Sequence, residues 1–255
     1  MTAAVTVNDA VVLFGSNRAV DGVSVTMTEG RCFGLVGESG SGKTTLMRAV
    51  LGLQKLHSGS ISFFGAPPET GNSGIRRRSR IVQAIFQDPA ASLSPRRTIG
   101  RLVDEVGEVL GERKEETRGR MAALFARMGL ANATADKYPY QLSGGQARRV
   151  AVVRALLMKP KILIADEPTA GLDVSVQGDL LNLLQELRRD GDLTLIVVSH
   201  NLAVVRLIAD EAAVMHRGKL IEQGPASAVF DHPAADYTRR LLASWPRLHV
   251  ASPAA

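Results

Sequence analysis

The stretch "CFGLVGESGSGKTTLMRAVLGL", residues 32–53, decides the fold. Its first five residues are apolar enough for a short buried strand, and Leu46, Val50 and Leu53 recur at helical spacing. Between them, residues 37–44 match the pattern GxxxxGK[ST]. Because the motif has the strand and the helix that it requires, it predicts a phosphate-binding loop. The residues expected to form this loop are Gly37, Glu38, Ser39, Gly40, Ser41, Gly42, Lys43, Thr44 and Thr45.

Each residue type in this loop has a physical role. Glycines let the backbone wrap closely around an anion. Lys43 is placed to reach the β and γ phosphates of a nucleotide, and the hydroxyl of Thr44 is a ligand for Mg²⁺. The motif therefore predicts a site for a nucleotide and its magnesium ion.

Two further apolar runs end in residues that carry chemistry. "KILIADEP" (residues 161–168) leads into Asp166 and Glu167, and "LTLIVVSH" (residues 193–200) leads into His200. Continuous apolar runs suit parallel strands covered on both faces, and ligands bind beyond the carboxyl ends of such strands. We expect these three side chains to converge on the phosphates held by Lys43.

The expected roles follow from charge. One carboxylate can hold Mg²⁺ through water, and the next can orient or deprotonate the water that attacks the γ-phosphate. We assign Asp166 to the metal and Glu167 to the water. A single histidine is more often a structural hydrogen bonder, but the place of His200 at a strand end favours a catalytic role.

A second glycine pair opens a predicted helix in "QLSGGQARRVAVVRALL", residues 141–157. Its free N–H groups and the positive end of the helix dipole would face whatever lies in front of Ser143. The stretch lacks a lysine at the position where a phosphate loop carries one. From the residues alone, it is either an ordinary helix cap or half of a second anion site.

Composition limits the remaining possibilities. A length of 255 residues with 45% hydrophobic residues predicts one large domain, or one domain with an inserted lobe. The single cysteine, Cys32, excludes an internal disulfide and predicts a core position. No apolar run reaches the length of a membrane span and the N-terminus lacks a signal core, so we expect a cytoplasmic protein.

The net charge of +6 is compatible with binding to nucleic acid, with binding to an anionic membrane surface and with a merely basic composition, and it does not distinguish among them. The sharpest basic run, "IRRRSR" at residues 75–80, has no interleaved aromatic residues. A surface that stacks bases would need them. We therefore expect a solvated face.

With these motifs in order, the chain resembles the ATP-binding cassette (ABC) family over about residues 5–225. The resemblance rests on "GESGSGKTT", "IFQDP", "LSGGQ", "ILIADEP", "AGLD" and "VSH". It implies an α/β fold: a P-loop NTPase cassette with a mainly parallel core sheet, an N-terminal antiparallel β subdomain and an inserted helical lobe. The implied boundaries are 1–240 for the ATPase domain, with about 88–158 as the helical lobe, and 241–255 for a C-terminal tail.

The resemblance also implies residue roles. Ser143, Gly144, Gly145 and Gln146 belong to the signature motif, which completes the ATP site of a second cassette in a head-to-tail dimer. Gln87 corresponds to a residue that touches Mg²⁺ and relays movement to membrane subunits, and Asp173 to one that crosses the dimer. Phe14 stands where the family has an aromatic residue that stacks on adenine, and a core phenylalanine is the alternative.

The function implied is an ATP-hydrolysing subunit of a membrane importer, held on the inner face of the cell membrane by two permease subunits that work with a solute-binding protein. "QDPAASLSPR" and "DHPAADYTRRLLASWP" resemble the importer branch for peptides and nickel, although Ala234, Ala235 and Asp236 interrupt the second motif. Two alternatives stay open: a soluble ABC ATPase acting on nucleic acid or the ribosome, and a nucleotide-sensing interaction module. Because the chain carries Glu167 and His200 and lacks long coiled-coil insertions, we expect the importer and no nucleic-acid partner.

Overall fold

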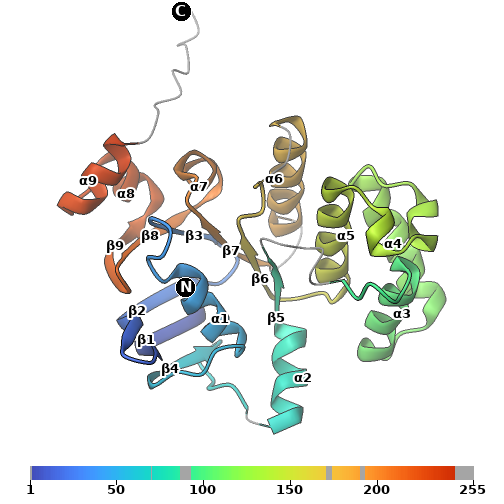
Figure 1. The fold of residues 1–255 in the computed structure, drawn as a ribbon, viewed down its shortest axis with the longest axis horizontal. Coiled ribbons are helices and arrows are strands. Elements are labelled where there is room, and N and C mark those ends of the chain that lie inside the picture. The colour runs from blue at the N-terminus through green and yellow to red at the C-terminus, as the bar shows by residue number, and fades with distance from the viewer. Residues whose placement is uncertain (1, 70, 87–92, 171–173, 190–192, 245–255) are drawn as a thin grey trace, which may run out of the picture.

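The computed structural model describes residues 2–69, 71–86, 93–170, 174–189 and 193–244 (Figure 1). The N-terminal part is a three-stranded antiparallel sheet in the order β2-β1-β4, made of β1 (Ala3–Phe14), β2 (Asn17–Thr28) and β4 (Ser58–Phe63). Valines and Met27 alternate with exposed polar residues along β2, so one face of this sheet is buried. The expected antiparallel sheet is present.

The second sheet has the order β5-β6-β7-β3-β8-β9. Its strands are β5 (Val82–Ile85), β6 (Ile162–Asp166), β7 (Thr194–Ser199), β3 (Cys32–Val36), β8 (Glu211–His216) and β9 (Lys219–Pro225). All neighbours are parallel except β8 and β9. Every residue of β3, β6 and β7 is buried, as their continuous apolar sequences predict. Because these three strands are adjacent, their carboxyl ends share one edge of the sheet.

Helices cover both faces of this sheet. The helices of the described residues are α1 (Lys43–Leu51), α2 (Gly71–Ile81), α3 (Ile99–Leu110), α4 (Lys114–Arg127), α5 (Gly144–Leu157), α6 (Val174–Arg189), α7 (Leu202–Ile208), α8 (Ala226–Asp231) and α9 (Asp236–Ala243), with 3₁₀ turns at Asn132–Asp136 and Pro139–Gln141. In Figure 1, α3, α4 and α5 lie together at the end of the molecule away from the N-terminal sheet. Among the described residues, no helix is both long and apolar enough to cross a membrane.

The helical lobe expected at about residues 88–158 includes two helices, α3 and α4. Gly111 ends α3 in the left-handed conformation, with φ of 73°. Arg118 on α4 joins the two helices, because it binds Asp104 with two hydrogen bonds of 2.8 and 3.1 Å. Asp104 is buried on α3, and a bidentate bond to a buried carboxylate is stronger than an exposed pair along one helix.

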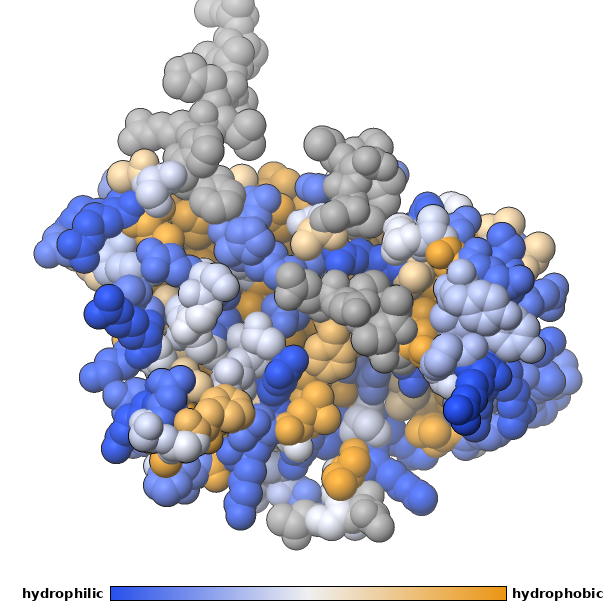
Figure 2. Space-filling model, viewed as in Figure 1, coloured by the Kyte–Doolittle hydropathy of each residue, from blue (hydrophilic) through white to orange (hydrophobic). Residues whose placement is uncertain are grey.

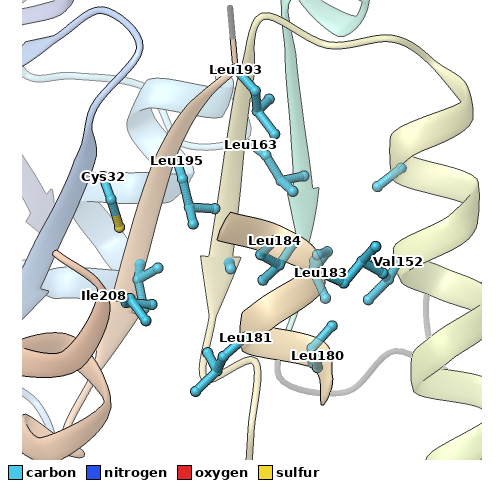
Figure 3. Packing of buried hydrophobic residues seen from close by; sticks show 14 of the residues in the cluster. Cys32, Val152, Leu163, Leu180, Leu181, Leu183, Leu184, Leu193, Leu195 and Ile208 are labelled. Atoms are coloured by element: carbon cyan, nitrogen blue, oxygen red, sulfur yellow. The ribbon is translucent and has the colours of Figure 1, made fainter. Parts of the chain in front are cut away.

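Two hydrophobic clusters hold the layers together. One lies between the N-terminal sheet, α1 and one face of the parallel sheet, where Val25, Leu46 and Ile164 are buried. The other lies on the opposite face, where α6 and α7 cover the strands (Figure 3). Cys32 belongs to this second cluster, as expected, and burial raises the pKa of its thiol to about 12.

The basic run of residues 75–80 lies on α2. The residues Arg76, Arg77 and Arg80 are exposed, and the solvated face expected there stays a prediction. In Figure 2 the visible surface is largely hydrophilic, with separate apolar side chains between the charged ones. Leu53 and Ile75, which are both about two-thirds exposed, are among the apolar residues left on the surface.

Candidate functional site

The phosphate loop lies between β3 and α1, where the sequence predicts it. Gly37 and Gly42 have φ angles of 150° and 102°. A Cβ atom on Gly37 would stand 2.2 Å from the carbonyl oxygen of Met215, and one on Gly42 would stand 2.3 Å from that of Ala19. Only glycine fits these two positions, so backbone from β8 and β2 fixes the path of the loop.

Lys43, the first residue of α1, is 7% exposed and points into the loop. Its Nζ donates to the carbonyl oxygens of Gly37 and Glu38, both at 2.8 Å, and to Oγ of Ser41 at 3.2 Å. Burial lowers the pKa of Lys43, and the nearby carboxylates Glu167 and Asp166 oppose that change. The loop therefore presents one cation whose donors could pass to the oxygens of a phosphate group.

Thr44 and Asp166 form the second part of the site. The hydroxyl of Thr44 donates to Oδ2 of Asp166 at 3.1 Å. Asp166 ends β6 and is 7% exposed, and burial raises the pKa of its carboxyl group. A hydroxyl and a carboxylate side by side are the hard oxygen ligands that Mg²⁺ prefers. These residues fit the magnesium ion that the sequence predicts.

Glu167 follows Asp166 and is held by the end of β7. Its Oε2 accepts from the hydroxyl of Ser199 at 2.9 Å, and its Oε1 accepts from the backbone N–H of His200 at 2.7 Å. The backbone of Glu167 is in the left-handed region, with φ of 50°. A residue with a side chain adopts this conformation only where its surroundings impose it.

These residues line one pocket of about 750 Å³. Phosphate-loop residues 39–45 form one wall, and Asp166, Glu167 and His200 form another. The expected convergence at the carboxyl ends of β3, β6 and β7 is therefore present. The volume lies in the range of pockets that bind small molecules and cofactors.

Five residues that the sequence reasoning missed complete the pocket: Asn17, Arg18, Ala19, Arg217 and Gly218. The first three come from β2 and the last two from the turn between β8 and β9. The backbone N–H of Gly218 donates to the carbonyl oxygen of Ser41 at 2.9 Å, which holds this turn against the phosphate loop. Neither segment carries a motif, and only the turn glycine in "HRGK" was a visible signal.

Phe14, Gln87 and Asp173 are the remaining residues that the sequence predicts at the site. Phe14 is 53% exposed at the end of β1, so the alternative of a core phenylalanine is wrong. It is not among the residues that line the pocket, and adenine stacking stays a prediction. Gln87 and Asp173 lie outside the described residues.

The signature motif begins α5. Ser143 caps the helix by accepting from the backbone N–H of Gln146 at 3.2 Å, and the Gln146 side chain accepts from the N–H of Ser143 at 3.1 Å. Ser143 and Gly144 are exposed, and residues 143–146 do not line the pocket that the described residues form around Lys43. In Figure 1, α5 and α1 lie on different sides of β5. The two glycine-rich helix starts of one chain are therefore separate surfaces.

Comparison with known proteins agrees with this geometry. The family model described as ABC transporter matches residues 20–170. The oligopeptide transport ATP-binding protein OppD of Mycobacterium tuberculosis is 44% identical over 234 residues, which cover 91% of this chain and 38% of OppD. OppF of Escherichia coli, also an oligopeptide transport ATP-binding protein, is 41% identical over 232 residues, which cover 90% of this chain and 70% of OppF. The chain thus spans about two-fifths of the length of OppD.

A solved structure gives the same result for the fold. The ATP-binding cassette MJ0796, solved as a dimer in a post-hydrolysis state with ADP and Pi, superposes with a TM-score of 0.79. It is 26% identical in sequence, and the match covers 87% of this chain and 98% of that one. The α/β fold expected from the sequence, with a mostly parallel sheet and an antiparallel sheet, is confirmed. The chain belongs to the ABC transporter family.

Proposed function

We propose that the chain binds and hydrolyses ATP and thereby powers a membrane importer for oligopeptides, nickel or a related small solute. The observation that carries this proposal is the place of Glu167: it lines one pocket with Lys43, Thr44 and Asp166, and the end of β7 holds its carboxylate by hydrogen bonds. The relatives OppD and OppF are named as oligopeptide transport ATP-binding proteins. Neither name favours the nucleic-acid alternative.

The side chains divide the work of phosphoryl transfer, in which positioning and charge stabilisation dominate. Lys43 would bind the β and γ phosphates when its donors leave the loop carbonyls. Thr44 and Asp166 would hold Mg²⁺, which when bound neutralises phosphate charge. Glu167 would orient and deprotonate the attacking water, and His200 would lie beside it at the γ-phosphate end of the pocket.

We further propose that a complete site needs two cassettes. The exposed start of α5, with Ser143, Gly144, Gly145 and Gln146, would bind the γ-phosphate of ATP held by the Lys43 of a second cassette. A head-to-tail pair related by a two-fold axis satisfies both half-sites at once. MJ0796 was solved as a dimer, which supports this arrangement. The second cassette is a copy of this chain or a paralogue.

The remaining roles rest on the family resemblance. Gln87 would contact Mg²⁺ and relay movement, Asp173 would cross the dimer, and Phe14 would stack on adenine. The domain boundaries at residues 88, 158 and 240 are also proposed from the family resemblance. The last of these boundaries falls inside α9, which runs from Asp236 to Ala243.

A groove of about 330 Å³ suggests where permease subunits attach. It is lined by α2, β5 and α5 and by the residues after α1, including the exposed Leu53 and Ile75. Apolar side chains left at the rim of a groove favour a protein partner. We propose that permease subunits hold the chain here, on the inner face of the membrane, and connect it indirectly to a solute-binding protein.

The interruption by Ala234, Ala235 and Asp236 in the C-terminal motif, residues 231–246, has a local explanation. Glu222 on β9 accepts from the backbone N–H groups of Ala234 at 2.7 Å and of Ala235 at 3.0 Å, and α9 begins at the next residue. The extra residues therefore provide the start of a helix that β9 holds in place. These contacts keep the C-terminal motif packed against the domain. They do not distinguish a peptide from nickel as the transported solute.

Uptake in whole cells tests the proposal. A strain lacking the chain is complemented with the parent or with Glu167→Gln, and the uptake of a labelled tripeptide and of Ni²⁺ is measured. We expect the parent alone to restore uptake of one of the two solutes. If uptake of both is independent of the chain while DNA stimulates its ATPase activity, the nucleic-acid alternative replaces the importer.

A further inference from the structure

The signature helix and Glu167 of the same chain are joined by one buried side chain. Arg148 lies one turn into α5 and is 7% exposed. Its Nη1 donates to the carbonyl oxygens of Glu167 at 3.2 Å, of Pro168 at 3.1 Å and of Ala170. A guanidinium stays charged when it is buried, so its burial is costly unless acceptors such as these satisfy its donors. Arg148 therefore fastens α5 to the segment that leaves β6.

The segment that Arg148 binds is the one that sets the backbone of Glu167. The N–H of Glu167 donates to Val198 on β7 at 2.8 Å, while its carbonyl oxygen accepts from Arg148. The left-handed φ of Glu167 is an unfavourable conformation, with a cost on the order of 1 kcal/mol. The backbone of Glu167 is thus held in this conformation by hydrogen bonds to β7 on one side and to α5 on the other.

We propose that Arg148 is a positioning residue that transmits the state of the signature half-site to the Glu167 of its own chain. This rests on the proposed pairing of two cassettes. When the nucleotide of the second cassette binds at Ser143, α5 shifts as a stiff unit, and Arg148 moves with it. The carbonyl oxygens of residues 167, 168 and 170 follow, so the Glu167 carboxylate reaches its working position only when the neighbouring half-site is filled.

The neighbouring residue provides a matched control. Arg149 stands next to Arg148 on α5 and is half-buried, but it donates to the carbonyl oxygens of Gly145 at 3.3 Å and Met128 at 3.2 Å. Its contacts stay within α5 and the end of α4 and do not reach Glu167. Arg148→Gln and Arg149→Gln therefore remove the same charge from the same helix, and only the first breaks the connection to β6.

The test compares these two variants, and Arg148→Lys, with the parent chain. ATP affinity is measured by nucleotide titration, folding by thermal unfolding, and kcat, KM and the Hill coefficient by phosphate release at increasing ATP. We expect Arg148→Gln to keep its ATP affinity and KM within about twofold, to lose on the order of tenfold or more in kcat, and to lower the Hill coefficient from about 2 towards 1. Arg148→Lys should recover part of kcat, and Arg149→Gln should resemble the parent.

Three outcomes overturn the proposal, and the last of them is distinguishable because it also overturns the pairing of cassettes. In the first, the parent is cooperative and folded Arg148→Gln has the same kcat and Hill coefficient. Arg148 then does not connect α5 to Glu167, and the proposed pairing of cassettes is unaffected. The same holds if Arg149→Gln loses as much kcat as Arg148→Gln. A parent chain that hydrolyses ATP without cooperativity overturns the pairing of cassettes, and the role of Arg148 falls with it.

Discussion

The Nδ1 atom of His200 lies 2.6 Å from Oε1 of Glu167, the same oxygen that accepts the backbone N–H of His200. The histidine ring remains 61% exposed on the pocket side. The carboxylate is therefore oriented by the residue that follows β7, and both side chains line the pocket. Because both the ring and the backbone N–H of His200 contact this oxygen, His200 orients the carboxylate that Glu167 would present to a water molecule.

The first prediction concerns Glu167→Gln. Glutamine keeps the size of the side chain, its Oε1 can still accept the N–H of His200, and its Nε2 can donate to the Ser199 hydroxyl oxygen, but it cannot accept the proton of water. Loss of a positioned general base reduces kcat by about 10² to 10⁴-fold. Loss of a negative charge beside the γ-phosphate should strengthen an ATP-bridged pair. If the chain pairs with itself, light scattering after size exclusion should show a dimer with ATP and a monomer without it. A variant that hydrolyses ATP at nearly the parent rate would contradict the assigned role, and an inactive variant that stays monomeric would indicate a different cassette as its partner.

The second prediction concerns Lys43→Ala. The change removes the only lysine of the phosphate loop, along with three donated hydrogen bonds. In the ATP complex these donors would pass from the loop to the phosphate oxygens. Each hydrogen bond from a charged group contributes about 1.5 to 3 kcal/mol, so ATP affinity should fall by at least tenfold. Nucleotide titration measures this, with the exposed Lys55→Ala as the control that changes the same net charge. An unchanged ATP affinity in a folded Lys43→Ala protein would remove Lys43 from the site.

The third prediction concerns Ser143→Arg. The arginine would stand on the exposed start of α5 and block the approach of a second cassette, so hydrolysis should stop while ATP binding to the isolated chain stays nearly intact. Ser143→Ala is the control, because it also loses the helix cap, at about 1 kcal/mol, but adds no bulk. Phosphate release measures hydrolysis. If Ser143→Arg turned over ATP as fast as Ser143→Ala, the composite site would be wrong.

The fourth prediction concerns the helical part of the chain. Burial raises the pKa of Asp104, but the hydrogen bonds and charges of Arg118 and Lys114 outweigh it and hold the pKa below its usual range. A carboxyl group with a lowered pKa stabilises the fold at neutral pH and loses this contribution as pH falls through the folded pKa. Asp104→Asn should therefore lower the free energy of unfolding at pH 7 by about 2 kcal/mol.

Thermal unfolding of Asp104→Asn and the parent at pH 7 and below pH 4 measures this difference. The two proteins should approach each other at the lower pH, because the parent carboxyl group then becomes protonated. The exposed pair of Arg101 and Glu108 on α3 supplies the control, and Glu108→Gln should change stability much less. Equal stability of Asp104→Asn and the parent at pH 7 would contradict the prediction.

The fifth prediction concerns the single thiol. Burial raises the pKa of Cys32 from 9.0 to about 12, which lowers the thiolate population at pH 8 by roughly a thousandfold. Because the thiolate is the reactive form, a disulfide reagent should leave the native protein unlabelled for hours and label one thiol at once in denaturant. The absorbance of the released thiol measures both. Rapid labelling without denaturant would show that Cys32 is not in the core.

The sequence predicted the parts of the site that carry a motif and a regular period. The apolar run at Cys32–Val36 is β3 without a shift, and the runs before Glu167 and His200 are β6 and β7. Adjacent parallel strands explain why the three ends meet. The sequence did not predict that Arg18, Arg217 and Arg148 lie at or contact the site. Packing between segments far apart in the chain brings each of them there. Such contacts leave no period or spacing in a single sequence.

The two glycines that no other residue can replace have a consequence for how the molecule is made. Gly37 is confined by the backbone of residue 215 and Gly42 by that of residue 19, so the phosphate loop takes its shape only when an early and a late strand have both docked against it. A ribosome that has released only the first 200 residues holds a chain with every motif of the ATP site but without one wall of the loop. ATP affinity should therefore appear late in synthesis, after β8 has joined the sheet, and nucleotide would act on the growing chain as a marker of completed assembly.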